Sequence, residues 1–344
     1  MGTEVPLASV LEAVSRSFYL SIRFLPAATR RPVAIAYLLA RAADSVADTP
    51  RLPVARRLAS LLVLRELCEN AAPCPPGFPP ADVLAGQELA GERALLGRLG
   101  ECLELLRALD EADGTLVREV LRVLTGGMVE DLRRFPEAGA PPGALATRAD
   151  LDRYCYSVAG CVGEFWTRLH ARHRPALSSL PLDEQVADGI RLGKGLQTVN
   201  VLRDLPRDLR RGRCYLPLED LQRAGLAPVD LLEPAAWPRV RPIVDPWIEV
   251  GFAHLEAGLR WLRRLPAGER RLRLTGWWPL ALGVDTLGRL RHAPNLLDPA
   301  AVVKVPRRSV YFLMLGSFLR GGSDRYLTRR FATLAARGGF PFAG

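Results

Sequence analysis

The sequence predicts an all-α fold, formed by a single domain over residues 1–344, on three observations. Long segments rich in Leu, Ala and Arg repeat their apolar residues at helical spacing. Clusters of Pro and Gly separate these segments, at Pro73–Pro80, Pro136–Gly143 and Leu231–Pro242. Signals for strands are nearly absent, and neither an internal repeat nor a change of composition marks a domain boundary.

The periodic segments predict eleven helices, which we expect to surround a central cavity. They span residues 6–22, 31–47, 53–70, 88–108, 112–134, 148–172, 182–208, 216–223, 244–264, 275–290 and 308–320. The part of the chain that carries motifs runs from about residue 10 to residue 320.

The composition is that of a globular protein with ample core, because 49% of the 344 residues are hydrophobic and 24% are charged. The net charge of +10 comes almost wholly from arginine, since Lys194 and Lys304 are the only lysines. A basic surface can favour anionic substrates or acidic lipid headgroups. No basic run with interleaved aromatic residues occurs, so we expect no nucleic-acid partner.

Targeting signals are also lacking. The six cysteines form no CxxC pair, which favours reduced thiols in a cytoplasmic protein. No signal peptide and no transmembrane helix are predicted. The most apolar stretch, Val310–Leu319, is short and flanked by arginines, so it can contact a membrane or pack in the core. Core packing is the favoured interpretation, with peripheral contact at the inner membrane as the alternative.

A first polar stripe follows the segment 31–47. Tyr37, Arg41, Asp44 and Asp48 are spaced by four, three and four residues, so they share one face of a helix. Two aspartates about 6 Å apart along a helix repel each other unless a cation lies between them. Mg²⁺ is typically held by one or two carboxylates together with substrate phosphates. A solvated acidic face is the alternative for such a motif by itself.

A second acidic motif lies near residue 204. Its three oxygen ligands share one helix face over two turns, and they are Asn200, Asp204 and Asp208. Pro206 should loosen the helix, which either frees carbonyls toward the site or marks the helix end. The residues placed to hold phosphate oxygens are Arg203, Arg213 and Tyr215.

Between the two motifs lies a helical segment rich in small residues. Ser157, Ala159, Gly160 and Gly163 fall within about two turns. Glycine inside a helix costs up to ~1 kcal/mol relative to alanine, so its presence needs a reason. Either a second helix crosses closely there, or a low floor lets a long apolar chain lie across it.

These segments resemble the squalene/phytoene synthase family, and within it most closely the squalene synthases. The similar stretches are SRSFYLSIRFLP and AYLLARAADSVADT, then YCYSVAGCVGEFW, then NVLRDLPRDLRRGRCYLP. They occur in the family's order, and the resemblance is strong from Ser15 to Leu221. It implies a single α-helical isoprenoid-synthase domain with the two aspartate motifs facing each other across a cavity.

The resemblance also implies roles for individual residues. The metal ligands would be Asp44, Asp48, Asn200, Asp204 and Asp208, with Mg²⁺ as the ion and Mn²⁺ as an alternative. The diphosphate-binding residues would be Tyr37, Arg41, Arg203, Arg213 and Tyr215. A segment that closes over substrate and borders the NADPH pocket would be formed by Ser15, Arg16, Ser17 and Phe18. Tyr154 would act in the first half-reaction with Tyr37, Arg41 and Arg203. Gln197 would line the same cavity as Tyr154, and Val158 and Val162 would line the prenyl channel.

Two further positions are less well matched. Lys304 and Arg307 fall where squalene synthases hold the NADPH phosphates, although a solvated basic turn explains them equally well. Many squalene synthases carry a glutamate where this chain has Ala47, but the outer aspartates of the motif are kept. The C-terminal anchor of the eukaryotic enzymes is not seen, which indicates a soluble bacterial form, expected to be a monomer or a weak homodimer.

The implied reaction joins two farnesyl diphosphates to presqualene diphosphate, which NADPH then reduces to squalene. A phytoene or dehydrosqualene synthase, or an enzyme that stops at presqualene diphosphate or hydroxysqualene, would share the first step without the hydride transfer. A non-catalytic helical assembly factor is the remote alternative, and it predicts eroded aspartate motifs.

Overall fold

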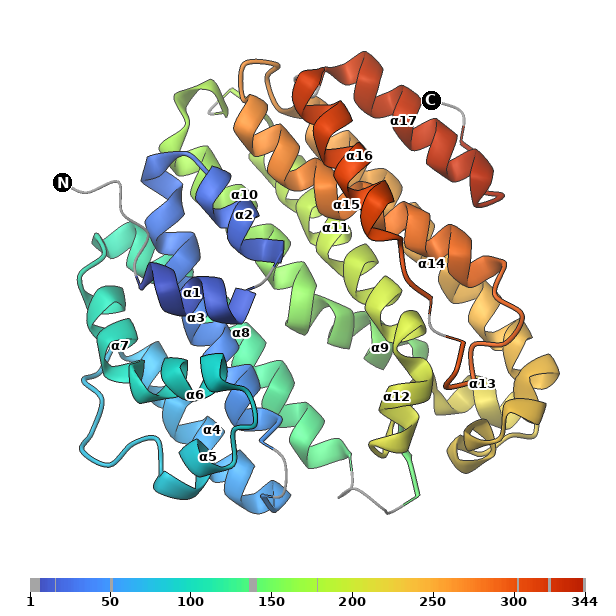
Figure 1. Ribbon diagram of the computed structural model, residues 1–344, viewed down its shortest axis with the longest axis horizontal. Coiled ribbons are helices and arrows are strands. Elements are labelled where there is room, and N and C mark those ends of the chain that lie inside the picture. The colour runs from blue at the N-terminus through green and yellow to red at the C-terminus, as the bar shows by residue number, and fades with distance from the viewer. Residues whose placement is uncertain are drawn as a thin grey trace. The chain divides into compact units, whose positions relative to one another are not determined.

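The computed structural model describes residues 7–15, 17–49, 52–135, 141–177, 179–301, 303–320 and 323–342. The chain divides into two compact units, Met1–Arg134 with Phe165–Pro175 and Phe135–Glu164 with Ala176–Gly344. Helices dominate both units, so the all-α prediction is confirmed (Figure 1). That the chain forms a single domain stays a prediction.

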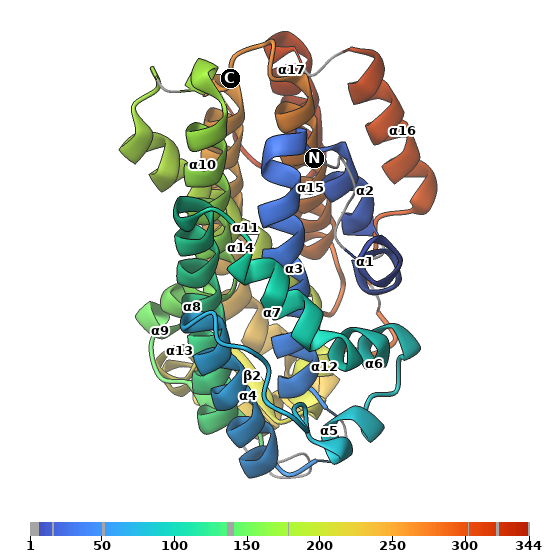
Figure 2. The same ribbon diagram turned by 90° about the vertical axis from the view of Figure 1, so that its left-hand side faces the viewer.

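The first unit is built around one central helix. Its helices are α1 Ala8–Ser15, α2 Ser17–Phe24, α3 Ala27–Ala47, α4 Val54–Glu69, α5 Ala81–Ala85, α6 Ala90–Gly97, α7 Leu99–Arg107 and α8 Glu111–Arg134. The helix α3 packs against α4, α7 and α8 (Figure 2). Its Ile35, Leu38 and Val46 are fully buried, whereas its polar stripe is left at the edge of this core.

The second unit contains the remaining helices. They are α9 Arg148–Cys155, α10 Cys161–His173, α11 Leu182–Arg203, α12 Leu205–Arg210, α13 Leu218–Arg223, α14 Trp237–Arg264, α15 Arg270–Arg291, α16 Arg307–Leu319 and α17 Asp324–Arg337. The residues of α10 from Phe165 onward belong to the first unit. The most extensive packing joins α11 to α14, and α15 packs on α14, α11 and α17. A π-helix, Tyr156–Gly160, connects α9 to α10.

A two-stranded parallel sheet was not foreseen by the sequence pattern. The strand β1 Gly143–Leu145 pairs with β2 Arg213–Pro217, with Gly143 opposite Arg213 and Ala144 opposite Cys214. Because β2 contains Arg213 and Tyr215, these two predicted site residues lie on a hydrogen-bonded strand.

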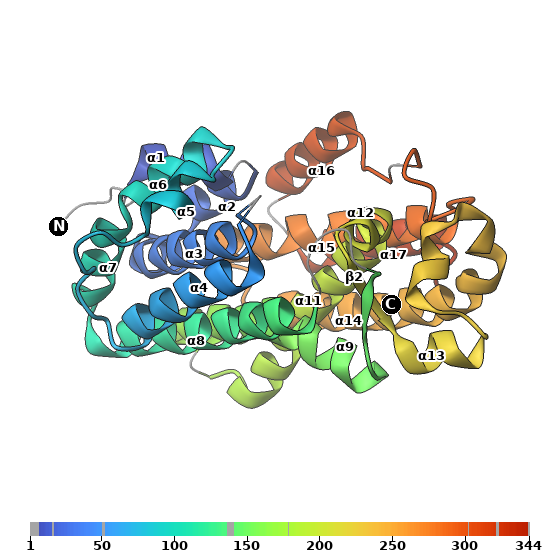
Figure 3. The same cartoon turned by 90° about the horizontal axis from the view of Figure 1, so that it is seen from below.

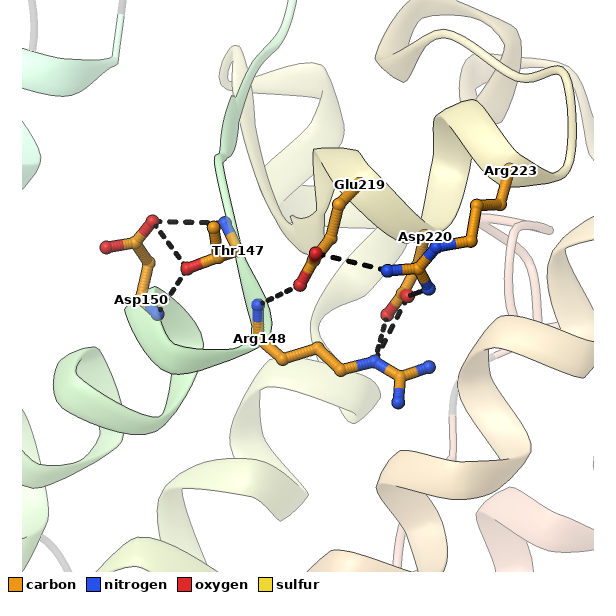
Figure 4. A network of polar contacts seen from close by, with 6 residues as sticks. All are labelled: Thr147, Arg148, Asp150, Glu219, Asp220 and Arg223. Atoms are coloured by element: carbon orange, nitrogen blue, oxygen red, sulfur yellow. Dashed lines mark hydrogen bonds and ion pairs between the residues drawn. The ribbon is translucent and has the colours of Figure 1, made fainter.

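A polar network fixes the start of α9 next to this strand (Figure 4). The backbone N–H of Asp150 donates to the Thr147 hydroxyl at 3.2 Å, and the Thr147 N–H donates to the Asp150 carboxylate at 3.0 Å. This reciprocal arrangement satisfies donors at the helix start. Arg148 then donates from its backbone to Glu219 and from its side chain to the buried carboxylate of Asp220, both at 2.8 Å. The first turn of α9 is therefore tied to α13, which directly follows β2.

The helix boundaries differ from the predicted ones in particular places. The predicted helices 6–22 and 88–108 are each divided in two, and α5 and α17 were missed. The helix α14 starts at Trp237, earlier than predicted, although it contains Pro242 and Pro246. Both prolines are exposed and lie four residues apart, while Ile243 and Val244 between them are buried. Packing of the apolar face offsets the missing N–H groups.

The stretch Val310–Leu319 corrects the favoured interpretation. It forms most of α16, but only Leu313 and Ser317 of this helix are buried. The helix lies on the outer side of α15, away from α11 and α14 (Figures 2 and 3). The prediction that it packs in the core is therefore wrong for most of its side chains. Within the described residues, no helix combines the length and the apolar character that crossing a membrane requires.

Candidate functional site

The first aspartate motif closes the C-terminal end of α3. The N–H of Asp48 donates to the carbonyl of Asp44 at 2.9 Å, so the two residues are separated by one helical turn on the same side. Arg41 Nη1 donates to Asp44 Oδ2 at 2.6 Å. Tyr37 completes the stripe, and its hydroxyl donates to the Val14 carbonyl at 3.4 Å. Burial raises the pKa of the Tyr37 phenol, so this group stays protonated.

Glu92 of α6 is a residue of this cluster that the sequence did not reveal. Its carboxylate accepts a short hydrogen bond from Arg41 Nη2, so one guanidinium bridges two carboxylates. The partners are 51 residues apart in sequence. No local spacing rule could pair them. Glu92 holds the Arg41 side chain in place while Asp44 remains half exposed.

The second motif lies across a break in the backbone. The helix α11 ends at Arg203 and α12 begins at Leu205, which leaves Asp204 at the junction. The helical hydrogen bonds from Asp204 to Asn200 and from Asp208 to Asp204 persist, each at 2.9 Å. The three predicted ligands therefore stay on one face despite the break. Of the two effects expected of Pro206, the structure shows a helix end, followed at once by a new helix.

Arginines surround the carboxylates of this second motif. Asp204 accepts hydrogen bonds from Arg203 Nε at 3.0 Å, Arg203 Nη2 at 2.8 Å and Arg207 Nη2 at 2.9 Å. Burial works against the charged form of Asp204, but the hydrogen bonds and charges of these arginines outweigh it and hold its pKa below the usual range. For Asp208 burial wins and raises the pKa, although Arg207 partly offsets it. A carboxylate buried in this way is stabilised by an added cation.

The donor set of each motif fits Mg²⁺. Each supplies two carboxylates, and the second adds the amide of Asn200, which also donates to Gln197 Oε1 at 3.2 Å. Hard oxygen ligands of this number are typical of Mg²⁺ sites that are completed by phosphate oxygens. Across the described part of the chain, no three His, Cys, Asp or Glu side chains converge on one point. An ion held by two carboxylates would be completed by water molecules and substrate phosphate oxygens.

An aromatic cluster in the second unit brings together two predicted site residues from distant segments. The rings of Tyr154 and Tyr215 are stacked, with centroids 4.4 Å apart and an interplanar angle of 23°. Phe135, which the sequence analysis missed, packs edge-on against Tyr215 at 5.3 Å. The Tyr215 side chain is buried, so its stacked ring fixes one face of the Tyr154 ring.

The small-residue segment is explained by a close helix crossing. A Cβ added to Gly163 would lie 2.0 Å from the carbonyl oxygen of Gly189, and one added to Gly193 would lie 2.2 Å from that of Ala159. The helix α11 therefore fills the space beside Gly163, and Gly193 of α11 makes room for the backbone at Ala159, so the low-floor alternative is not needed for these glycines. Val158 and Val162 are half-buried, and Val158 lies in the π-helix, a feature often found at functional sites.

The remaining predicted residues are less informative. Ser15 is buried and its hydroxyl donates to the Leu11 carbonyl within α1. Arg16 and the side chains of Ser17 and Phe18 lie outside the described residues. Lys304 and Arg307 are exposed, just before and at the start of α16. The predicted cavity with facing motifs stays a prediction.

The comparison with known families is decisive. A family model described as squalene/phytoene synthase matches residues 11–309. The chain belongs to the squalene/phytoene synthase family. Members of this family join prenyl diphosphates head to head and generally depend on a divalent metal ion such as Mg²⁺. Both predicted motifs lie within the matched residues.

Relatives in the squalene/phytoene synthase family differ in product. The presqualene diphosphate synthase of Rhodopseudomonas palustris is 30% identical over 265 residues, which cover 77% of this chain and 81% of that protein. The 15-cis-phytoene synthase of Synechocystis sp. is 28% identical over 334 residues, covering 89% and 85%. The solved structure of TcSQS with the ligand E5700 matches with a TM-score of 0.80 at 21% identity, covering 98% of this chain and 92% of that one. At this identity the structural likeness shows the fold.

Proposed function

We propose that this chain joins two farnesyl diphosphates head to head and forms presqualene diphosphate in a Mg²⁺-dependent reaction. The observation that carries the proposal is the pair of aspartate motifs, each with an arginine bonded to its carboxylate, in a member of the squalene/phytoene synthase family. The name of the Rhodopseudomonas palustris relative favours the C15 substrate.

In the first step the carbon–oxygen bond of the donor breaks and its electron pair leaves with the diphosphate. Mg²⁺, when bound at the two motifs, supplies positive charge to the leaving group. Arg41, Arg203 and Arg213 add hydrogen-bond donors where negative charge accumulates on that group. Arg41 and Arg203 now hold Asp44 and Asp204, so they can turn to phosphate oxygens once a metal ion occupies the carboxylates.

The resulting allylic cation needs an apolar, electron-rich surrounding. The double bond of the acceptor attacks it, and loss of a proton closes the cyclopropane ring. We assign Tyr154 to this half-reaction, because the buried Tyr215 ring stacked behind it fixes its position. Aromatic faces stabilise nearby cations. Val158 and Val162 would help to exclude water, which otherwise traps the cation as an alcohol.

Reduction of the intermediate to squalene with NADPH is a second candidate. The observation in its favour is the exposed basic pair of Lys304 and Arg307, which suits the phosphates of a dinucleotide. Phytoene and dehydrosqualene synthesis are the variants without hydride transfer.

The test is product analysis after incubation of the purified protein with farnesyl diphosphate. Presqualene diphosphate that forms with Mg²⁺, and does not form with a chelator, supports the proposal. Squalene that appears only when NADPH is added establishes the second candidate as well. Phytoene from the C20 diphosphate with no reaction on the C15 substrate contradicts the proposal, as does the absence of any product from a folded protein.

A further inference from the structure

The exposed side of α16 carries the largest group of exposed large hydrophobic side chains among the described residues. Tyr311, Phe312, Leu315, Phe318 and Leu319 are between 52% and 72% exposed. They account for five of the eleven large hydrophobic side chains that are exposed among the described residues. At 100° per residue these five positions fall within one arc of about 120°. Contiguous apolar surface of this kind marks an interaction site.

The opposite face of α16 is packed against the protein, so the helix has one buried and one exposed side. Leu313 and Ser317, the buried residues, lie four apart on the opposite face, and the Ser317 hydroxyl accepts a hydrogen bond from Trp278 Nε1 at 3.0 Å. This bond anchors the helix to α15. The helix is therefore fixed on one side and presents its aromatic side outward.

The charged residues of the stretch that contains this face are all of one sign. The stretch 303–320 contains Lys304, Arg307, Arg308 and Arg320, and no Asp or Glu. Arg307 and Arg308 are exposed and, at helical spacing, continue the apolar face toward the N-terminal end of α16. An apolar helix face with aromatic residues and flanking cations is typical of helices that lie in the interface of an anionic bilayer.

We propose that the face of α16 formed by Tyr311, Phe312, Leu315, Phe318 and Leu319 docks the protein onto the surface of an anionic lipid bilayer. A helix of 13 residues is about 20 Å long, which is too short to cross a hydrocarbon core of about 30 Å. It therefore lies in the plane of the interface, with its aromatic side chains among the acyl chains and its arginines at the lipid phosphates.

A second copy of this chain is a poorer occupant. Two such faces in contact would bring their arginines together without any carboxylate in the stretch to neutralise them. An anionic bilayer meets both the apolar and the basic part of the surface.

The experiment measures co-sedimentation with vesicles in the absence of substrate, so its outcome does not depend on the proposed function. Vesicles of phosphatidylcholine with one quarter phosphatidylglycerol should bind the protein at least tenfold more tightly than pure phosphatidylcholine, and high salt should weaken this binding. The triple variant Phe312→Gln/Leu315→Gln/Leu319→Gln should lose at least tenfold in affinity. The matched control Leu182→Gln/Val229→Gln/Val250→Gln, which removes exposed apolar residues elsewhere, should bind like the wild type.

A second variant keeps the test independent of apolar packing. Arg308→Gln/Arg320→Gln leaves the apolar face intact and should weaken binding to anionic vesicles by about tenfold or more, since each cation near such a surface contributes about 1 kcal/mol. Absence of wild-type binding, or equal binding by the apolar variant and its control, overturns the proposal. So does a concentration-dependent dimer in sedimentation velocity that the apolar variant abolishes, because the face would then serve self-association.

Discussion

In the first unit, Asp44 and Asp48 lie at the end of an unbroken helix, whereas in the second unit Asp204 lies at a break between two helices. Both motifs nevertheless keep the helical hydrogen bond that sets their carboxylates one turn apart, at 2.9 Å in each case. A spacing of four residues thus predicts a shared face even where the helix is interrupted, provided that this bond survives.

The charges around the two motifs differ more than their geometry. In the first, Arg41 is bonded to two carboxylates, those of Asp44 and Glu92. In the second, two arginines are bonded to the single carboxylate of Asp204. We therefore expect the first motif to be the better site for a metal ion by itself, and the second to be better prepared to receive a diphosphate.

The comparison between the two aspartate motifs fails if only one of them takes part in the reaction. Asp44→Asn and Asp204→Asn should each lower turnover by about 10²–10³, the range for removal of one group that stabilises charge in a transition state. Asp183→Asn, an exposed carboxylate at the start of α11, is the matched control and should retain full activity. Steady-state kinetics with circular dichroism makes the measurement, and full activity of either motif variant would refute its metal role.

Each unit should lose stability in acid through one histidine, which is buried in the first unit and half-buried in the second. Burial lowers the pKa of His170 in the first unit, and that of His254 in the second, to about 4 from an ordinary value of 6.5. Between these pH values the unfolded chain binds a proton that the folded chain does not, so stability falls as the pH falls through this window. For His170 the loss should reach about 3 kcal/mol near pH 4.

His170→Gln should remove this part of the pH dependence, and His254→Gln a smaller part, because His254 is less deeply buried. Urea unfolding at pH 7 and at pH 4.5 gives the free energies to compare. Identical pH dependence in the wild type and His170→Gln would show that the imidazole is already charged in the folded state.

The crossing of α10 and α11 should tolerate no added methyl group. Gly163→Ala places a Cβ 2.0 Å from a carbonyl oxygen, and we expect a loss of about 1–3 kcal/mol in the free energy of unfolding. Gly97→Ala, in α6 of the first unit, has open space around its Cβ and should be neutral or slightly stabilising. Thermal unfolding of both variants makes the measurement. Equal stability would mean that the crossing is looser than the structure shows.

The smallest expected effect concerns competition between arginine and metal. Arg207→Gln removes one of the cations on Asp204, so the affinity for Mn²⁺ without diphosphate should rise by about two- to fivefold, in keeping with the modest strength of an exposed ion pair. Arg210→Gln, an equal change of charge on a side chain bonded to the Pro206 carbonyl, should have less effect. Electron paramagnetic resonance of free Mn²⁺ reports the affinity. An unchanged affinity for Mn²⁺ would show that Arg207 does not compete with the metal ion for Asp204.

Local patterns in the sequence predicted the helices and the two motif faces, because both depend on hydrogen bonds and spacing within one segment. They missed what depends on distant partners. Glu92 on Arg41 and Phe135 against Tyr215 join residues 51 and 80 positions apart (215 − 135 for the second pair), and no periodicity links them. The helix α14 starts earlier than the sequence pattern predicts, because prolines usually end a helix, whereas here tertiary packing of the buried face outweighs them.

We propose that both motifs act on the same ionisation of a prenyl diphosphate. Diphosphate release from farnesyl diphosphate should therefore be measured for Asp48→Asn, Asp204→Asn and the double variant. Groups that act as a unit give losses that do not multiply, so the double variant should lose little more than the more impaired single variant. A double-variant loss equal to the product of the two single losses, or a single variant with unchanged release, would contradict the account.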